Sequence, residues 1–126
     1  MILHKSTIVL AACGALVAGC SAGSGIAGDL ACTKEARAGI TVDVRDSVTN
    51  ALVGQQSRII AREAAFADTL DAGNADGPYG LVFERAGTYT LSVTRPGYQS
   101  WSQAGLQVAA GTCHVVGVVV TARLQK

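Results

Sequence analysis

Regular alternation of apolar and polar residues is the strongest pattern in the chain. In residues 39–46, GITVDVRD, isoleucine and valine occupy every second position and polar residues occupy the others. The same alternation returns in residues 87–94, where Tyr89, Leu91 and Val93 are separated by threonine and serine. A period of two with β-branched and aromatic residues predicts strands that bury one face.

Further segments show the pattern less cleanly. Residues 58–70, RIIAREAAFADTL, are rich in alanine and fit either a helical turn or two short strands, and we favour the strands. Tyr79, Leu81 and Phe83 alternate after the dense turn signal DAGNADGPYG. YQSW and GLQV are interpreted as two shorter strands.

The last segment, residues 113–124, is the richest in valine. Its sequence CHVVGVVVTARL predicts one apolar face, made of Val116, Val118, Val120, Ala122 and Leu124. Val115 and Val119 lie on the other face, so we expect part of this strand to be covered on both sides. About seven short strands with regular turn signals predict an all-β, seven-stranded β-sandwich.

The first residues carry an export signal rather than a part of the fold. Lys5 is followed by STIVLAACGALVAG, which has no charge and is too short to span a membrane. Its small residues lead into Cys20, and this arrangement resembles the bacterial lipobox, in which the cysteine is acylated. The chain is therefore divided into a lipoprotein signal peptide (1–19), an acylated cysteine with a flexible Gly/Ser/Ala tether (20–31) and one domain (32–126).

Two alternatives at this end stay open. Cys13 also follows small residues, although only a short uncharged run separates it from Lys5. The other alternative is an ordinary signal peptide with incidental cysteines. Ser21 after the cysteine favours the outer membrane, by resemblance to Gram-negative lipoproteins.

The cysteines and the charge balance indicate a disulfide and limit the classes of partner. Of four cysteines, Cys32 and Cys113 remain for the domain, and two thiols in an exported domain predict one disulfide. Loss of Lys5 leaves nine basic residues against nine acidic ones, scattered singly. This balance argues against a nucleic-acid partner, which would require a basic patch.

Several of these stretches together resemble one known family. ITVDVRDSVTNALV, followed by DAGNADGPYGLVFERAGTYTLSVTRPGYQSW, is similar to the carboxypeptidase regulatory-like domain over roughly residues 38–124. The matching features are Asp46, the turn Asp76-Gly77-Pro78-Tyr79, Gly87-Thr88-Tyr89 and Gly97-Tyr98. The resemblance implies a transthyretin-like (prealbumin-like) Greek-key sandwich with an accessory role. The chain departs from the family pattern at Pro78, at Ala86 and at Glu63-Ala64-Ala65.

Few residues point to chemistry. His114 is the only histidine outside the signal peptide, and the sequence suggests no pairing of a histidine with an aspartate. Carboxylates cluster around one turn, and with Asn74 they echo a calcium loop without its spacing; turn formation explains them better: Asp68, Asp71, Asp76, Glu84. No G-x-S-x-G elbow occurs, so we expect neither a catalytic site nor a metal or other cofactor.

Tyr98 and Trp101 are the candidate ligand contacts, because aromatic residues near turns are common at binding hot spots. The alternative is that both cover the end of the core, and for Trp101 we expect packing to dominate. The sequence thus predicts a lipid-anchored envelope protein, a non-catalytic binding or structural module that contacts protein or polysaccharide. A hydrolase on a transthyretin-like scaffold is the main alternative, and a small-ligand carrier is a further one.

Overall fold

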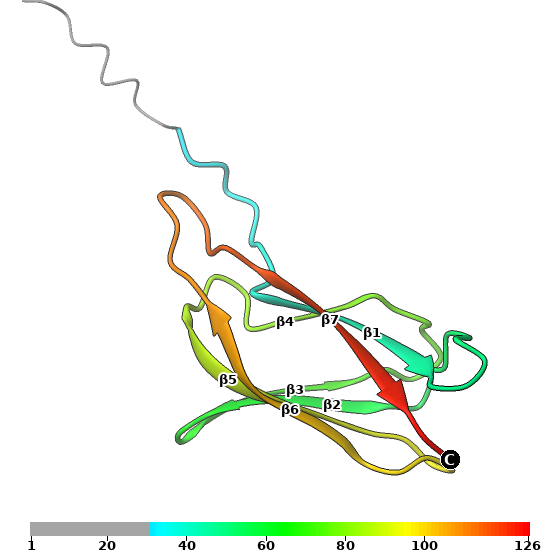
Figure 1. The fold of residues 1–126 in the computed structure, drawn as a ribbon. Coiled ribbons are helices and arrows are strands. Elements are labelled where there is room, and N and C mark those ends of the chain that lie inside the picture. The colour runs from blue at the N-terminus through cyan, green and yellow to red at the C-terminus, as the bar shows by residue number, and fades with distance from the viewer. Residues whose placement is uncertain (1–30) are drawn as a thin grey trace, which may run out of the picture.

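The computed structural model describes residues 31–126, and none of these residues forms a helix. Seven strands form two sheets (Figure 1): β1 (Ile40–Asp46), β2 (Arg58–Glu63), β3 (Phe66–Asp71), β4 (Tyr79–Leu81), β5 (Gly87–Thr94), β6 (Trp101–Val108) and β7 (Val118–Leu124). One sheet has the order β4-β1-β7 and the other β3-β2-β5-β6. The expectation of an all-β domain with two short strands in residues 58–70 is confirmed.

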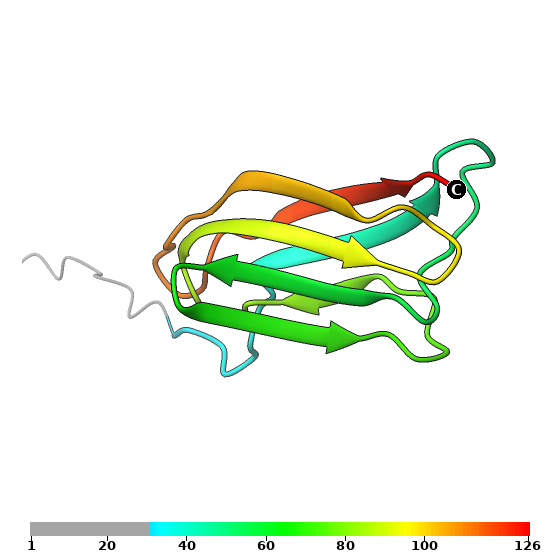
Figure 2. The same ribbon diagram turned by 90° about the horizontal axis from the view of Figure 1, so that it is seen from below.

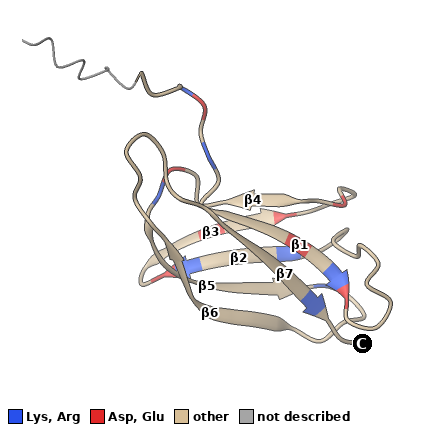
Figure 3. Ribbon diagram, turned by 45° about the horizontal axis from the view of Figure 1, so that its top comes forward, with Lys and Arg blue, Asp and Glu red and all other residues tan. Residues whose placement is uncertain are grey.

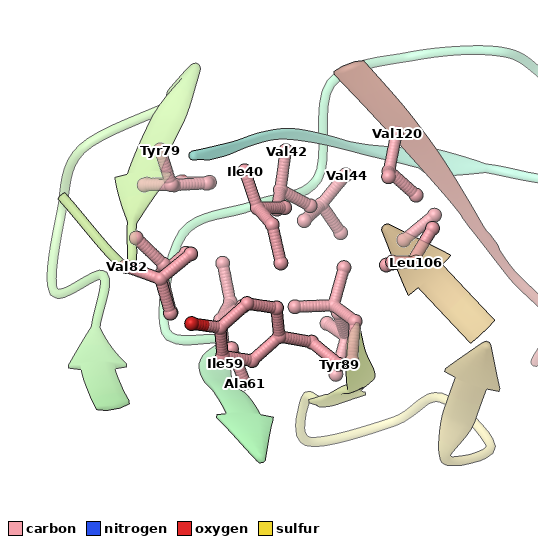
Figure 4. Packing of buried hydrophobic residues seen from close by; sticks show 14 of the residues in the cluster. Ile40, Val42, Val44, Ile59, Ala61, Tyr79, Val82, Tyr89, Leu106 and Val120 are labelled. Carbon is pink, nitrogen blue, oxygen red and sulfur yellow. The ribbon is translucent and has the colours of Figure 1, made fainter. Parts of the chain in front are cut away.

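The two sheets enclose one core between them (Figure 2). Alternation along β1 buries Ile40, Val42 and Val44 completely, and Ile59 and Tyr89 meet them from the facing sheet (Figure 4). Burying such side chains contributes about 1.5–3 kcal/mol each. The alternating pattern therefore determines which face of each sheet is turned inward.

Parallel pairing of β1 and β7 defines the two ends of the molecule. Ile40 pairs with Val118 and Asp46 with Leu124, so both strands start at one end and finish at the other. We call the first the disulfide end, because the bonded Cys32 and Cys113 lie there with their Cα atoms 5.1 Å apart. The other is the C-terminal end, where the connections 47–57, 72–78 and 95–100 lie (Figures 1 and 2).

β4 is shorter than the alternation predicts. It ends at Leu81, because Val82 adopts a left-handed conformation with φ of 49° and turns the chain. Phe83 is consequently 53% exposed rather than aligned with Tyr79 and Leu81. A Cβ atom at Gly80 would lie 2.8 Å from the Phe83 ring, so the ring covers the outer face of β4.

The valine-rich segment also departs from the prediction. β7 begins only at Val118, and Val116 is 59% exposed in the preceding loop, where it bridges to Ala109. Val119 is 77% exposed, so the prediction that part of this strand is covered on both sides is wrong for β7. The physical reason is that β7 lies in a three-stranded sheet whose outer face has no further layer among residues 31–126.

YQSW and GLQV do not form two separate strands: only Trp101 of YQSW lies in a strand, and this strand, β6, also contains GLQV. β6 runs from Trp101 to Val108, and Tyr98 to Ser100 form the turn before it. Between the pairs Tyr89–Leu106 and Leu91–Gln103, β6 contains one residue more than β5. This β-bulge contains Gly105 at φ of 73°, a conformation that glycine adopts without steric cost.

Candidate functional site

The candidate residues separate onto the two ends of the molecule. Tyr98 and Trp101 lie at the C-terminal end, Tyr98 on the connection from β5 to β6 and Trp101 as the first residue of β6. Cys32, Cys113 and His114 lie at the disulfide end. Cys20 and Cys13 fall outside the described residues. The described part of the chain has no helix of the length and apolarity that a membrane span requires.

Tyr98 is held in place by its hydroxyl group. This group donates a hydrogen bond of 2.8 Å to Asp46 Oδ2. Arg95 and Lys126 lie over the ring, at 5.0 Å and 5.7 Å from its centroid. The neighbouring carboxylate raises the pKa of Tyr98, first through this hydrogen bond. The hydroxyl thus connects the β5–β6 turn to the end of β1.

Asp46 is the hub of this end. Its Oδ1 accepts hydrogen bonds of 2.9 Å from the backbone N–H groups of both Val48 and Thr49. These bonds, with the one from Tyr98, lower its pKa from 3.8 to about 2, the Thr49 N–H contributing most. The three hydrogen bonds to this buried carboxylate therefore fix the 47–50 turn.

Trp101 is partly buried and packs against the core, and it also lines a cavity of about 390 Å³. The cavity lies between the start of β6 and the end of β7, the free edges of the two sheets. Its other lining residues are polar: Gln99, Ser100, Ser102, Arg123 and Gln125. The indole therefore serves the core and borders a polar hollow at the C-terminal end.

His114 takes part in a hydrogen-bonded series that the sequence did not reveal. Its Nδ1 lies 2.6 Å from Glu84 Oε1, and its Nε2 lies 2.9 Å from the Thr33 hydroxyl. The sequence suggests no His–Asp pairing, and the carboxylate beside His114 in the structure is that of a glutamate. Because His114 and Glu84 are 30 residues apart on two different loops, no local sequence motif could predict their contact.

Glu84 is fixed from several sides. Its Oε1 accepts a hydrogen bond of 2.7 Å from the Arg37 N–H, and its Oε2 accepts one from the Val115 N–H. These donors and His114 lower the pKa of Glu84, the Arg37 N–H most strongly. The carboxylate therefore ties the segment after Cys32 to the loop after Cys113, next to the disulfide.

The other carboxylates of the predicted cluster are dispersed. Asp68 accepts a hydrogen bond from the Val82 N–H, Asp71 pairs with Arg58 at 3.2 Å, and Asp76 accepts one from the Gln55 amide. Asn74 is exposed in the same turn as Asp76. Within residues 31–126, no three or more His, Cys, Asp or Glu side chains gather in a way that could hold a metal ion.

Arg85 pairs with Glu63 rather than with its neighbour Glu84. The guanidinium donates to Glu63 Oε1 at 2.9 Å and lies 3.8 Å from the centroid of the Phe66 ring. The Glu63 carboxylate also accepts a hydrogen bond from the Thr88 N–H, the main cause of its lowered pKa. This cluster holds the β2–β3 hairpin against the start of β5.

Basic and acidic residues are scattered over the strands and loops of the domain instead of gathering in one place (Figure 3). Comparison of the sequence with known proteins supplies no further assignment: no protein-family model matches the chain, and no curated protein matches it.

Proposed function

We propose that this chain is an envelope lipoprotein that is anchored through acylated Cys20. Its single β-sandwich would be a non-catalytic binding or structural module. The domain would be a transthyretin-like Greek-key sandwich of the carboxypeptidase regulatory-like type, and the anchor would lie in the outer membrane. Its partner would be an envelope protein or a polysaccharide.

One observation carries this proposal. The Cys32–Cys113 disulfide joins the segment that follows the tether to the loop before β7. An anchor at Cys20 would therefore hold the molecule by its disulfide end. The C-terminal end, with the Trp101 cavity, would then face away from the membrane, because β1 and β7 run in parallel from one end to the other. A tether of about ten flexible residues adds a reach of roughly 15–20 Å.

The strand order supports the finer assignment of the fold. In the immunoglobulin sandwich the first strand shares a sheet with the second, fourth and fifth strands. Here β1 lies between β4 and β7, and β2 belongs to the other sheet. The order thus differs from the immunoglobulin arrangement and favours another sandwich, consistent with the sequence resemblance to the transthyretin-like type.

Metabolic labelling with a palmitate analogue tests the anchor. We expect wild-type protein to be labelled and the Cys20→Ser variant to lose the label. The Cys13→Ser variant should retain it. Loss of label only in Cys13→Ser would move the anchor to that residue, and unchanged labelling of Cys20→Ser would refute Cys20 as the anchor.

A hydrolase is the second candidate function, and the Thr33–His114–Glu84 series favours it. In an acyl transfer, the Thr33 hydroxyl would be the nucleophile, His114 the general base and Glu84 the group that orients the imidazole. The same contacts also have a structural role, since they fasten the chain beside the disulfide. We favour that structural role.

Turnover of p-nitrophenyl acetate separates the two candidates. The binding account predicts the same rate for wild type, His114→Gln and Thr33→Val, equal to that of buffer. A wild-type rate that both substitutions abolish would establish the hydrolase instead.

A further inference from the structure

We propose that the Trp101 cavity is a binding site for an acidic glycan, a sugar chain whose rings carry carboxylates. This inference rests on the proposed function and names the class of ligand that the C-terminal end would bind.

The cavity exists because the two sheets separate along one side. β6 and β7 approach each other at both ends, through the hydrogen bonds Gln99 N–H to Gln125 O (2.7 Å) and Val116 N–H to Ala109 O (2.8 Å). Within the described residues the two strands form no ladder between these points. Gln103 pairs with Leu91, which is completely buried, yet Gln103 is exposed. The side between β6 and β7 is thus open to solvent.

The lining residues have the chemistry of sugar recognition. A sugar ring has an apolar C–H face and a rim of hydroxyl groups that both donate and accept hydrogen bonds. Trp101 packs against the core and contributes a small apolar part of the cavity wall, which can contact this face. Amide and hydroxyl groups around it can serve the rim, since each of them donates and accepts: Gln99, Ser100, Ser102, Gln125.

Charge at the cavity indicates an acidic sugar. Arg123 lines the cavity, is exposed and donates to the amide oxygen of Asn50 at 2.9 Å. Among residues 31–126, no carboxylate forms a salt bridge with Arg123, and no carboxylate lines the cavity. Lys126 and Arg95 lie nearby, over the Tyr98 ring. A guanidinium binds a carboxylate in a fixed, planar geometry and gives the site a preference for anions.

A glycan fits this site better than an extended peptide. A peptide that adds to a sheet edge needs a regular row of free backbone groups. On β6 the row is interrupted by the bulge at Gly105, a feature that commonly protects edge strands from such pairing. All the residues that line the cavity, apart from Trp101, carry polar or charged side chains.

The test uses full-length protein in detergent and two ligands that differ only in charge. Oligogalacturonate and its fully methyl-esterified form share the same rings, and Trp101, the only tryptophan in the chain, reports binding by its fluorescence. We expect the acidic form to bind about tenfold more tightly or better, the worth of one charged hydrogen bond. Equal affinity, or no binding of either form, would overturn the proposal.

Arginine variants test whether the preference for the acidic ligand arises at the Trp101 cavity. Arg123→Gln should remove the difference between the two ligands, and Arg123→Lys should retain part of it. Arg62→Gln is the matched control, because Arg62 is exposed on the other sheet, and it should leave both affinities unchanged. Loss of the preference in Arg62→Gln as well would show non-specific charge attraction and contradict the site.

The proposed function can survive failure of this test. If cross-linked envelopes yield one stoichiometric protein partner that Arg123→Gln fails to capture, the glycan assignment is wrong and the anchored binding module stands. If palmitate labelling fails while oligogalacturonate binds, the anchor is wrong and the glycan site stands.

Discussion

Asp46 shows how a single carboxylate organises the C-terminal end. It accepts hydrogen bonds from the N–H groups of Val48 and Thr49 in the following turn and from the Tyr98 hydroxyl. Since the partners lie on the chain directly after β1 and on the β5–β6 connection, one side chain joins the two sheets at this end. The order of the loops that border the Trp101 cavity depends on this contact.

Stability should therefore depend on acid pH through Asp46. Its pKa is about 2 in the folded protein against an ordinary value of 3.8, so its contribution is present above about pH 4 and is lost as the pH falls through 2. We expect Asp46→Asn to lower the melting temperature at pH 7, with a difference from wild type that shrinks toward pH 2. A difference that stays constant from pH 7 to pH 2 would contradict the role of the ionised carboxylate.

Ser57 differs from Asp46, because its buried polar side chain accepts and donates no hydrogen bond within the described residues. Its side-chain oxygen has no hydrogen-bond partner among the described residues, and the residue is 2% exposed. Because an unsatisfied buried hydroxyl costs about 1–3 kcal/mol, Ser57→Ala should stabilise the protein by about 1 kcal/mol in urea unfolding. Ser102→Ala, on exposed β6, is the control and should change stability by less than about 0.5 kcal/mol. A destabilised Ser57→Ala protein would point to a partner for the hydroxyl.

At the scale of elements, alternation predicted where strands lie better than where they end. The buried faces of β1 and β5 follow directly from the sequence, because every second side chain enters the core. The end of β4 does not follow, because Val82 takes a left-handed conformation that valine rarely adopts. The exposure of Val119 could not be predicted from the sequence either. A valine-rich strand has the same sequence pattern whether one or both of its faces are covered.

The bulge in β6 gives a prediction at this scale. A Cβ atom at Gly105 would meet nothing within 4 Å, so only the backbone conformation, with φ of 73°, opposes a side chain there. Gly105→Val should destabilise the protein by about 1–2 kcal/mol, and Gly105→Asn should cost less, because asparagine tolerates left-handed backbone. Urea unfolding of both variants checks the order. Equal costs would mean that the bulge straightens in the variants.

At the scale of the whole molecule, the disulfide joins the segment before β1 to the loop between β6 and β7. Cys32 and Cys113 are separated by 81 positions, and cross-linking such a loop stabilises by about 4.5 kcal/mol at most in the chain-entropy account. We expect the double variant Cys32→Ser/Cys113→Ser to unfold at much lower urea concentration. Thr112→Ser, in the same loop, should leave the midpoint unchanged. A double variant as stable as wild type would show that the sheets hold the two segments together without the bond.

The pairing of these cysteines was predictable, and the contacts around it were not. Two thiols in a domain that we expect to be exported leave one simple pairing, and the structure confirms this pairing. The contact of His114 with Glu84 and Thr33 is created by three loop segments that meet at the disulfide end. Likewise, Trp101 could be identified as a candidate, but its cavity depends on how far β6 and β7 separate, which no local pattern encodes.

Site-specific photo-cross-linking in intact envelopes tests the central claim, a module held by one end that binds with the other. A photoreactive residue in place of Ser100 or Gln125 samples the C-terminal end, and one in place of Ala36 or Ala86 samples the disulfide end; all four positions are exposed. The account predicts that the first pair becomes attached to an envelope partner, protein or polysaccharide, and that the second pair does not. Adducts confined to Ala36 and Ala86, with none at Ser100 and Gln125, would contradict it.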